Sequence, residues 1–226
     1  MQSICTIEHH AVLYALLARA VLKKGRQGRQ YLEAFTEQYG TERGKRMAAC
    51  AALESVEASA LTYPIFKEWR GEPGQMQTGM EENTSRFVTY VSRCQWVESW
   101  KKYGLLEFGK PYCRLIDKAL YSAYQPEAKL EVCSLLSAGD EQCRFDWGYE
   151  RDADSARRVK ELQERVGIKY VRDFDFHTSD LYRVACQVFG ACMGAEGETV
   201  CKNALKEFGD IFGEDAKRRV LEAAER

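Results

Sequence analysis

The 226-residue chain has the composition of a globular protein, with 45% hydrophobic and 30% charged residues. Its net charge of −1 gives no overall basic field to hold a nucleic-acid backbone. The longest apolar stretch, residues 11–22, is interrupted by Arg19 and is too short to span a bilayer, and the N-terminus lacks the features of a secretory signal. We therefore expect a cytoplasmic enzyme or small-molecule binder, with no nucleic-acid and no membrane partner.

The first part of the chain, residues 1–70, is predicted to be helical. Apolar residues recur with a 3.6-residue period over Val12–Val21, and Gly25 is placed to end that helix. A second helix is expected over Arg29–Tyr39. It closes at Gly40, and a third helix begins directly after it.

The middle part, residues 84–150, is predicted to be α+β, and it follows a loop or linker at residues 70–83 that is rich in turn formers. Strands are expected where apolar and polar residues alternate, and helices where the 3.6-residue period returns. The expected strands are residues 87–92, 129–136 and 142–147, and the expected helices are residues 96–103 and 111–121. The short loop 137–141 contains Gly139 and predicts a hairpin, so the sheet should be antiparallel.

The third part, residues 155–226, returns to helix and repeats features of the first part. Four glycines of the first part match four of the third at an offset of 169 residues: Gly25 and Gly194, Gly28 and Gly197, Gly40 and Gly209, Gly44 and Gly213. This order indicates an internal duplication, and chance similarity between two amphipathic helical segments is the alternative. We expect a single domain over residues 1–226, in which two similar helical hairpins flank a central antiparallel sheet with its own helices.

Nine cysteines, an odd number without any C-x-x-C pair, argue against a disulfide framework. We interpret them as reduced thiols. Four lie in helical apolar patterns and are expected to be small core residues: Cys50, Cys186, Cys192 and Cys201.

Cys113 and Asp117 are the first candidates for catalysis. They are four residues apart in a predicted helix, so both side chains lie on one face. Pro111 marks the first turn of that helix, where the helix dipole would lower the pKa of the Cys113 thiol.

Two further thiols and a carboxylate lie at the ends of predicted strands. Cys94 ends one strand, and Cys143 begins another just after Asp140. We expect Cys94, Cys113 and Cys143 to converge near one pocket with Asp117. The alternative for Cys143 is a core position, because it alternates with the aromatic residues of its own strand.

The three histidines all stand at the entrances of the two repeated helices: His9 and His10 in one copy and His177 in the other. Histidine is the usual proton carrier near neutral pH, so His9 and His177 are candidates for one cleft. The alternative is that each is a structural residue at a helix start. No zinc-ligand spacing is present, and a metal site assembled from distant thiols and histidines stays open.

Taken together, these segments resemble a known family. They are residues 94–104, the Tyr-Cys-x3-Asp motif at 112–117, the Gly-Asp-x2-Cys-x-Phe motif at 139–145, residues 43–48 and residues 176–183. The sequence is similar to the L-2-amino-thiazoline-4-carboxylic acid hydrolase family over nearly its whole length. The combination of the two motifs is the most specific part of the resemblance.

The resemblance implies a hydrolase acting on a non-peptide C–N bond of a cyclic amidine. Water adds to the ring carbon between sulfur and nitrogen, and the product is a carbamoyl amino acid. This chemistry needs a base or nucleophile, an acid, and a cation for the substrate carboxylate. We assign proton transfer to His177 and Asp117 and covalent attack to Cys113 or Cys143. The expected substrate-binding residues are Cys94, Asp140, His9 and Arg46, with Arg43 as a further cation.

No cofactor is expected, the partner is a small-molecule substrate, and a homo-oligomer stays open. A non-catalytic binding or sensor domain with the same cleft is the alternative from another class of function. A metal-dependent hydrolase is a third.

Overall fold

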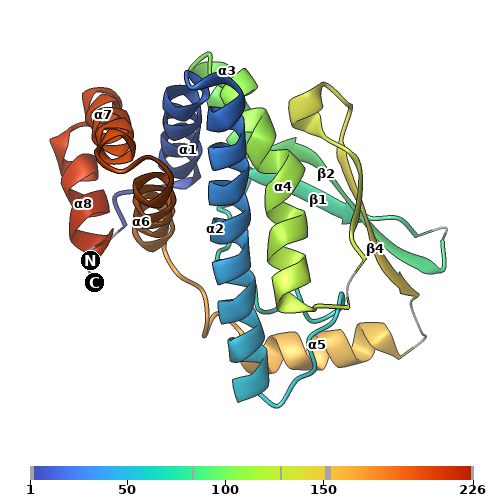
Figure 1. The fold of residues 1–226 in the computed structure, drawn as a ribbon. Coiled ribbons are helices and arrows are strands. Elements are labelled where there is room, and N and C mark those ends of the chain that lie inside the picture. The colour runs from blue at the N-terminus through green and yellow to red at the C-terminus, as the bar shows by residue number, and fades with distance from the viewer. Residues whose placement is uncertain (1–2, 83, 128, 151–153, 225–226) are drawn as a thin grey trace. The chain divides into compact units, whose positions relative to one another are not determined.

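Eight α-helices and a four-stranded antiparallel sheet form the part of the chain that the structure describes, which confirms the predicted α+β class (Figure 1). The structure is a computed structural model that describes residues 3–82, 84–127, 129–150 and 154–224. The chain divides into two compact units, each assembled from segments far apart in sequence. A helical unit comprises residues 1–39, 95–115 and 172–226, and a sheet unit comprises residues 40–94 and 116–171. The single domain expected over residues 1–226 stays a prediction.

The helical unit is built around one helix that is buried on nearly every side. The helices of this unit are α1 (Ile7–Leu22), α3 (Gln95–Lys102), α6 (Phe174–Met193), α7 (Ala195–Phe212) and α8 (Glu214–Ala224), together with the first parts of α2 (Gly25–Leu53) and α4 (Leu106–Tyr124). Every residue from Ala11 to Ala18 is buried. The reason is that α1 contacts α3, α6 and α7, while α8 covers α6 and α7 (Figure 1). The two expected helical hairpins thus contact each other directly.

Both hairpin corners in this unit begin with a glycine in the left-handed region. Gly25, which starts α2, has φ of +63°, and Gly194, between α6 and α7, has φ of +57°. Residues with a side chain rarely adopt this conformation, so glycine is required at both corners.

The same corners each hold a second glycine that lets the backbones of the two helices touch. A Cβ atom on Gly28 would lie 2.1 Å from the carbonyl oxygen of Val21. A Cβ atom on Gly197 would lie 2.0 Å from the carbonyl oxygen of Phe189. The two corners therefore share one construction at matched positions, which supports the predicted repeat in this part of the chain.

The similarity between the two copies does not continue beyond these corners. The helix end that was expected at Gly40 is wrong. Helix α2 runs without interruption through Gly40 and Gly44, whereas α7 stops before Gly213, which has φ of +93°. Gly44 serves close approach instead, because a Cβ atom there would lie 2.1 Å from the carbonyl oxygen of Leu120 on α4 (Leu106–Tyr124). From the sequence, a glycine that ends a helix and one that admits a neighbouring helix look alike.

We expect Gly197→Ala to destabilise the protein by about 1–3 kcal/mol, since the new methyl group overlaps the backbone of α6. Gly190→Ala, on the facing helix, is the matched control. A Cβ atom at Gly190 meets nothing within 4 Å, so this change should stabilise α6 by about 0.5–1 kcal/mol. Urea denaturation measures both. Equal effects of the two substitutions would contradict the close approach.

The sheet unit contains the strands β1 (Met76–Met80), β2 (Arg86–Cys94), β3 (Glu131–Ser134) and β4 (Cys143–Glu150) in the order β1-β2-β4-β3. All neighbours are antiparallel, as expected, and Val91 of β2 faces Cys143 of β4. The expected loop at residues 70–83 is wrong in part, because it contains β1. This edge strand is polar and largely exposed, so it carries little of the apolar alternation that identifies a strand.

Helix α4 begins at Leu106, five residues earlier than expected, and Pro111 lies inside it. Cys113 is therefore about two turns from the N-terminus of the helix, and the expected effect of the helix dipole on its thiol does not apply.

The core of the sheet unit is aromatic. Its largest buried members come from the segment after α2, from α4 and from β4: Tyr63, Phe66, Tyr121, Tyr124, Phe145 and Trp147. Helix α5 (Ser155–Val166) adds Val166 to this core. Among the described residues, no helix is long and apolar enough to cross a membrane.

Candidate functional site

Asp117 lies on α4 in the sheet unit and combines burial with exposure. Protein surrounds the side chain, and the resulting loss of hydration raises its pKa, while Lys67 and Arg43 offset part of that effect. The side chain nevertheless keeps part of its surface open to solvent, and we call its surroundings, which include Lys67 and Arg43, the charged recess. In the described part of the chain, its carboxylate has no hydrogen bond and no salt bridge. A carboxylate of this kind can accept and return a proton.

Lys67 is the second charged group of this recess. Burial lowers its pKa, although the charge of Asp117 acts in the opposite direction. The ammonium lies 5.9 Å from the ring centre of Tyr63 and 5.8 Å from that of Trp69. The two aromatic rings stabilise the charge of the Lys67 ammonium. Among the described residues, no carboxylate forms a salt bridge with this ammonium.

Glu68, next to Lys67 in sequence, holds two arginines of α2 in place. Its carboxylate accepts from Arg43 Nε at 3.2 Å and from Arg46 Nε at 2.7 Å and Nη2 at 3.1 Å. Glu68 and Arg43 are both buried, which makes this ion pair part of the framework. Arg43 also contributes positive charge at Asp117.

Tyr63 connects the charged recess to an aromatic cluster. Burial raises the pKa of its phenol, and the charge of Asp117 adds to the effect. Its ring centre lies 5.3 Å from that of Tyr121 and 5.1 Å from that of Trp147. Tyr121 and Trp147 are themselves 4.9 Å apart in an edge-to-face arrangement. Since Tyr121 follows Asp117 by one turn of α4, the aromatic cluster and the carboxylate share one helix face.

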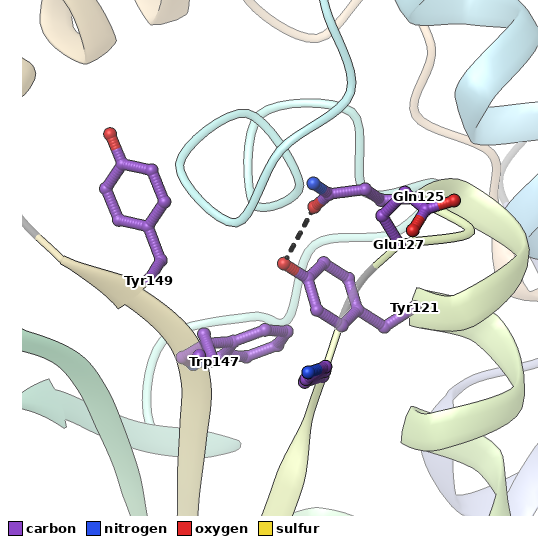
Figure 2. Close-up of a pocket in the computed structure, with 7 residues that line it drawn as sticks. Tyr121, Gln125, Glu127, Trp147 and Tyr149 are labelled. Atoms are coloured by element: carbon purple, nitrogen blue, oxygen red, sulfur yellow. Dashed lines mark hydrogen bonds between the residues drawn. The ribbon is translucent and has the colours of Figure 1, made fainter.

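On its other side this cluster borders a cavity of about 290 Å³. Figure 2 shows Trp147 and Tyr149 of β4 on one side of it and Tyr121 and Gln125 on the other. Tyr121 donates a hydrogen bond to Gln125 Oε1 at 3.0 Å, drawn as a dashed line in Figure 2. Glu127 and Lys129 contribute one charge of each sign. The cavity can thus take a flat group with polar substituents.

Two of the three predicted thiols lie in the sheet unit. The charges of Cys94, Asp117 and Asp140 each act on the Cys143 thiol, and the predicted convergence of these residues on one pocket stays a prediction. Burial raises the pKa of Cys143 to about 12, although the backbone N–H of Leu136 donates to its sulfur at 3.3 Å. The thiol is therefore protonated at neutral pH, which weighs against covalent attack by Cys143.

Asp140 has a local role in the turn between β3 and β4. Its exposed carboxylate accepts the backbone N–H of Leu135 at 2.7 Å. This bond closes the turn in which Gly139 has φ of +107°. The geometry explains Asp140 without a substrate, and its predicted role in binding stays a prediction.

The other predicted residues lie in the helical unit, where His10 forms a fixed hydrogen-bonded chain. Trp96 Nε1 donates to His10 Nδ1 at 3.1 Å, so the ring proton of the neutral histidine lies on Nε2. His10 Nε2 lies 3.0 Å from the hydroxyl of Tyr39, which donates to the backbone carbonyl of His177 at 3.3 Å. His10 is therefore a structural residue, as its sequence position suggests.

His177 and His9 occupy different surroundings in this unit. The ring of His177 is buried and lies 5.5 Å from the ring centre of Phe174. His9 stacks on Phe212 at 4.1 Å, and its Nδ1 accepts the backbone N–H of Thr6 at 3.3 Å, which caps α1. Burial lowers the pKa of His9. Their roles in proton transfer and substrate binding stay predictions.

Cys113 also belongs to the helical unit. Its thiol is half-buried and acts electrostatically on Tyr14, whose phenolic pKa burial raises. The expected convergence of Cys113 with Cys94 and Cys143 joins residues of both units and stays a prediction.

Sequence reasoning missed Lys67 and Tyr63. They lie in an irregular segment between α2 and β1, where no hydrophobic period singles out a position. The signal that could have found them is local: charged residues 67 and 68 directly follow the apolar run 63–66. Charges placed against a buried segment are seldom merely solvated.

No group of three or more His, Cys, Asp or Glu side chains in the described ranges is arranged to hold a metal ion. Searches of curated proteins and of solved structures gave no match. The sequence model of one family matches residues 5–147, more than half of the chain, and this match includes Lys67, Asp117 and Cys143. The chain therefore belongs to the L-2-amino-thiazoline-4-carboxylic acid hydrolase family.

Proposed function

We propose that the recess lined by Asp117 and Lys67 hydrolyses a non-peptide C–N bond in a carboxylate-bearing cyclic amidine. The observation that carries the proposal is the Asp117 carboxylate, which is desolvated, has no hydrogen-bond partner in the described residues and lies near two cations. A carboxylate that has lost hydration and has no hydrogen-bond partner lowers the stability of the fold. Such groups are typical of sites where a bound ligand supplies the missing hydrogen bonds. The family name supports the reaction class.

In this reaction Asp117 acts as the base. It takes a proton from water as the oxygen attacks the amidine carbon, and it returns that proton to the ring nitrogen of the tetrahedral adduct. It then takes the proton of the new hydroxyl group and gives it to the same nitrogen, so that a carbonyl forms as the C–N bond breaks. The raised pKa of Asp117 suits both steps, because a group with a pKa nearer the working pH transfers protons in both directions.

Lys67 binds the carboxylate of the substrate. Its ammonium is close enough to Asp117 for their charges to interact, so a substrate held by Lys67 places its ring beside the base. Arg46 and Arg43 are held by Glu68 and stabilise the positive end of the recess. The aromatic cluster of Tyr63, Tyr121 and Trp147 provides a flat surface for the ring.

Turnover of a panel of cyclic amidines and lactams, read by mass spectrometry, tests the proposal. We expect 2-aminothiazoline-4-carboxylate or a close analogue to gain the mass of one water. Binding of these compounds to the folded protein without any turnover would overturn the proposal in favour of a sensor domain.

The role of the thiols in the sheet unit is tested separately. We expect Cys143→Ala to keep kcat within about threefold of wild type, because a thiol with a pKa of about 12 supplies almost no thiolate at neutral pH. Steady-state kinetics measure it, with Cys133→Ala at an exposed position as the control. A loss of kcat in Cys143→Ala alone, with an unchanged melting temperature, would favour covalent catalysis instead.

A further inference from the structure

The α6–α7 hairpin of the helical unit contains a pair of thiols outside the proposed hydrolytic site. Cys186 lies on α6 and Cys201 on α7, and the two thiols are close enough to shift each other's pKa. The hydroxyl of Tyr182, one turn before Cys186 on α6, also acts on the pKa of the Cys186 thiol. Three groups that can hold or release a proton therefore meet inside one hairpin.

The backbone explains why these thiols meet. Gly197 brings α7 against the carbonyl of Phe189 so closely that even a Cβ atom would not fit. Cys186 lies three residues before Phe189, and Cys201 lies four residues after Gly197. In two antiparallel helices both positions are one turn further from the Gly194 corner, so the two cysteines lie opposite each other, one turn beyond this close contact.

The two cysteines differ in exposure. Cys186 is half-buried and reachable from solvent, whereas Cys201 is buried, with 1% of its surface exposed. A small reagent therefore reaches Cys186 first, and Cys201 is placed behind it.

We propose that Cys186 and Cys201 form a redox-active dithiol that reacts with low-molecular-weight disulfides. The Cys186 thiolate attacks one sulfur of the small disulfide, forms a mixed disulfide and releases one small thiolate. Cys201 then loses its proton to that thiolate and attacks the Cys186 sulfur, which expels the second small thiolate. The products are an intramolecular Cys186–Cys201 disulfide, one small thiol and one small thiolate, which takes up the proton that Cys186 gave to water when its thiolate formed.

The electrostatics of the hairpin favour this order of attack. The Cys201 thiol lowers the pKa of Cys186, burial opposes it, and the Tyr182 hydroxyl adds to the lowering. The Cys186 thiol raises the pKa of Cys201, and burial adds to that. Glu198 and Lys202 of α7, paired at 3.4 Å, act on the Cys186 charge in opposite directions. Cys186 is thus the thiolate, and Cys201 is the proton donor that later resolves the intermediate.

Oxidised glutathione with the full-length protein tests the proposal by peptide mapping. We expect wild type to give a cross-linked pair of peptides carrying Cys186 and Cys201, two hydrogens lighter than their sum, which dithiothreitol reverses. In Cys201→Ser the reaction should stop at the mixed disulfide, so glutathione should accumulate on Cys186. In Cys186→Ser neither residue should react, and Tyr182→Phe should slow the reaction of Cys186 several-fold.

Cys192, exposed on the same helix, supplies the control. Cys192→Ser should form the cross-link at the wild-type rate. Circular dichroism melting confirms that each variant is folded. Wild-type protein with glutathione on Cys192 or Cys133 and no cross-link would overturn the proposal, as would a Cys201→Ser variant in which Cys186 reacts no faster than Cys192.

Discussion

Asp117→Asn is expected to lower kcat by about 10²–10⁴-fold, since the amide can neither accept the proton of water nor return it to the leaving nitrogen. The melting temperature at pH 7 should stay unchanged or rise. Burial raises the pKa of Asp117 even with the attraction of Lys67 and Arg43 included, so the ionised carboxylate costs stability in the folded state. Steady-state kinetics and thermal denaturation of the same preparation measure both effects.

The sign of the pH dependence follows from the same shift. The cost of the ionised carboxylate is present in full above the folded pKa and disappears as the pH falls toward the unfolded value, near 3.8. Any gain in stability of Asp117→Asn should therefore be seen at pH 7 and vanish in acid. In wild type, kcat/KM should fall in acid with an apparent pKa above 3.8.

Glu107→Gln, an exposed carboxylate at the start of the same helix, is the matched control and should leave both activity and melting temperature near wild type. If Asp117→Asn instead melts well below wild type, the carboxylate is a structural acceptor. If it keeps full activity, the hydrolytic site lies elsewhere.

The periodic parts of the fold could be predicted from sequence, and the parts that depend on a distant partner could not. The stripe in α1 and the Gly139 turn between β3 and β4 each depend on neighbouring residues, and both were predicted correctly. The continuity of α2 through Gly44 depends on the backbone of Leu120, which is 76 residues away in sequence. No local pattern contains that information.

The candidate site divides in the same way. Asp117 was found because it belongs to a motif with a recognisable spacing. Lys67 was not found, because its significance comes from lying near Asp117, and 50 residues separate them. Arg46 was assigned to the substrate because it is a cation on a helix, yet its position is explained by Glu68, a partner 22 residues along the chain. Residue type alone does not tell which cation already has a carboxylate.

Lys67→Met is expected to lower kcat/KM for a carboxylate-bearing substrate by about 10–100-fold, the usual effect of losing a hydrogen bond between charged groups. The loss should appear mainly in KM, because the carboxylate does not take part in bond breaking. 2-Aminothiazoline, which lacks the carboxylate, should be hydrolysed by Lys67→Met and by wild type with similar kcat/KM. Lys118→Met, an exposed neighbour of Asp117, should leave both substrates unaffected.

Lys67→Arg gives a second readout of the same group. Burial lowers the pKa of Lys67 from 10.5, so binding of the carboxylate should weaken as the pH rises through that lowered value. A guanidinium keeps its charge throughout this range, and the alkaline fall of kcat/KM should therefore move to higher pH in Lys67→Arg. An alkaline limb that is the same in both proteins would show that another group titrates there. An equal loss of activity on both substrates in Lys67→Met would mean that Lys67 supports the fold of the recess and does not bind the carboxylate.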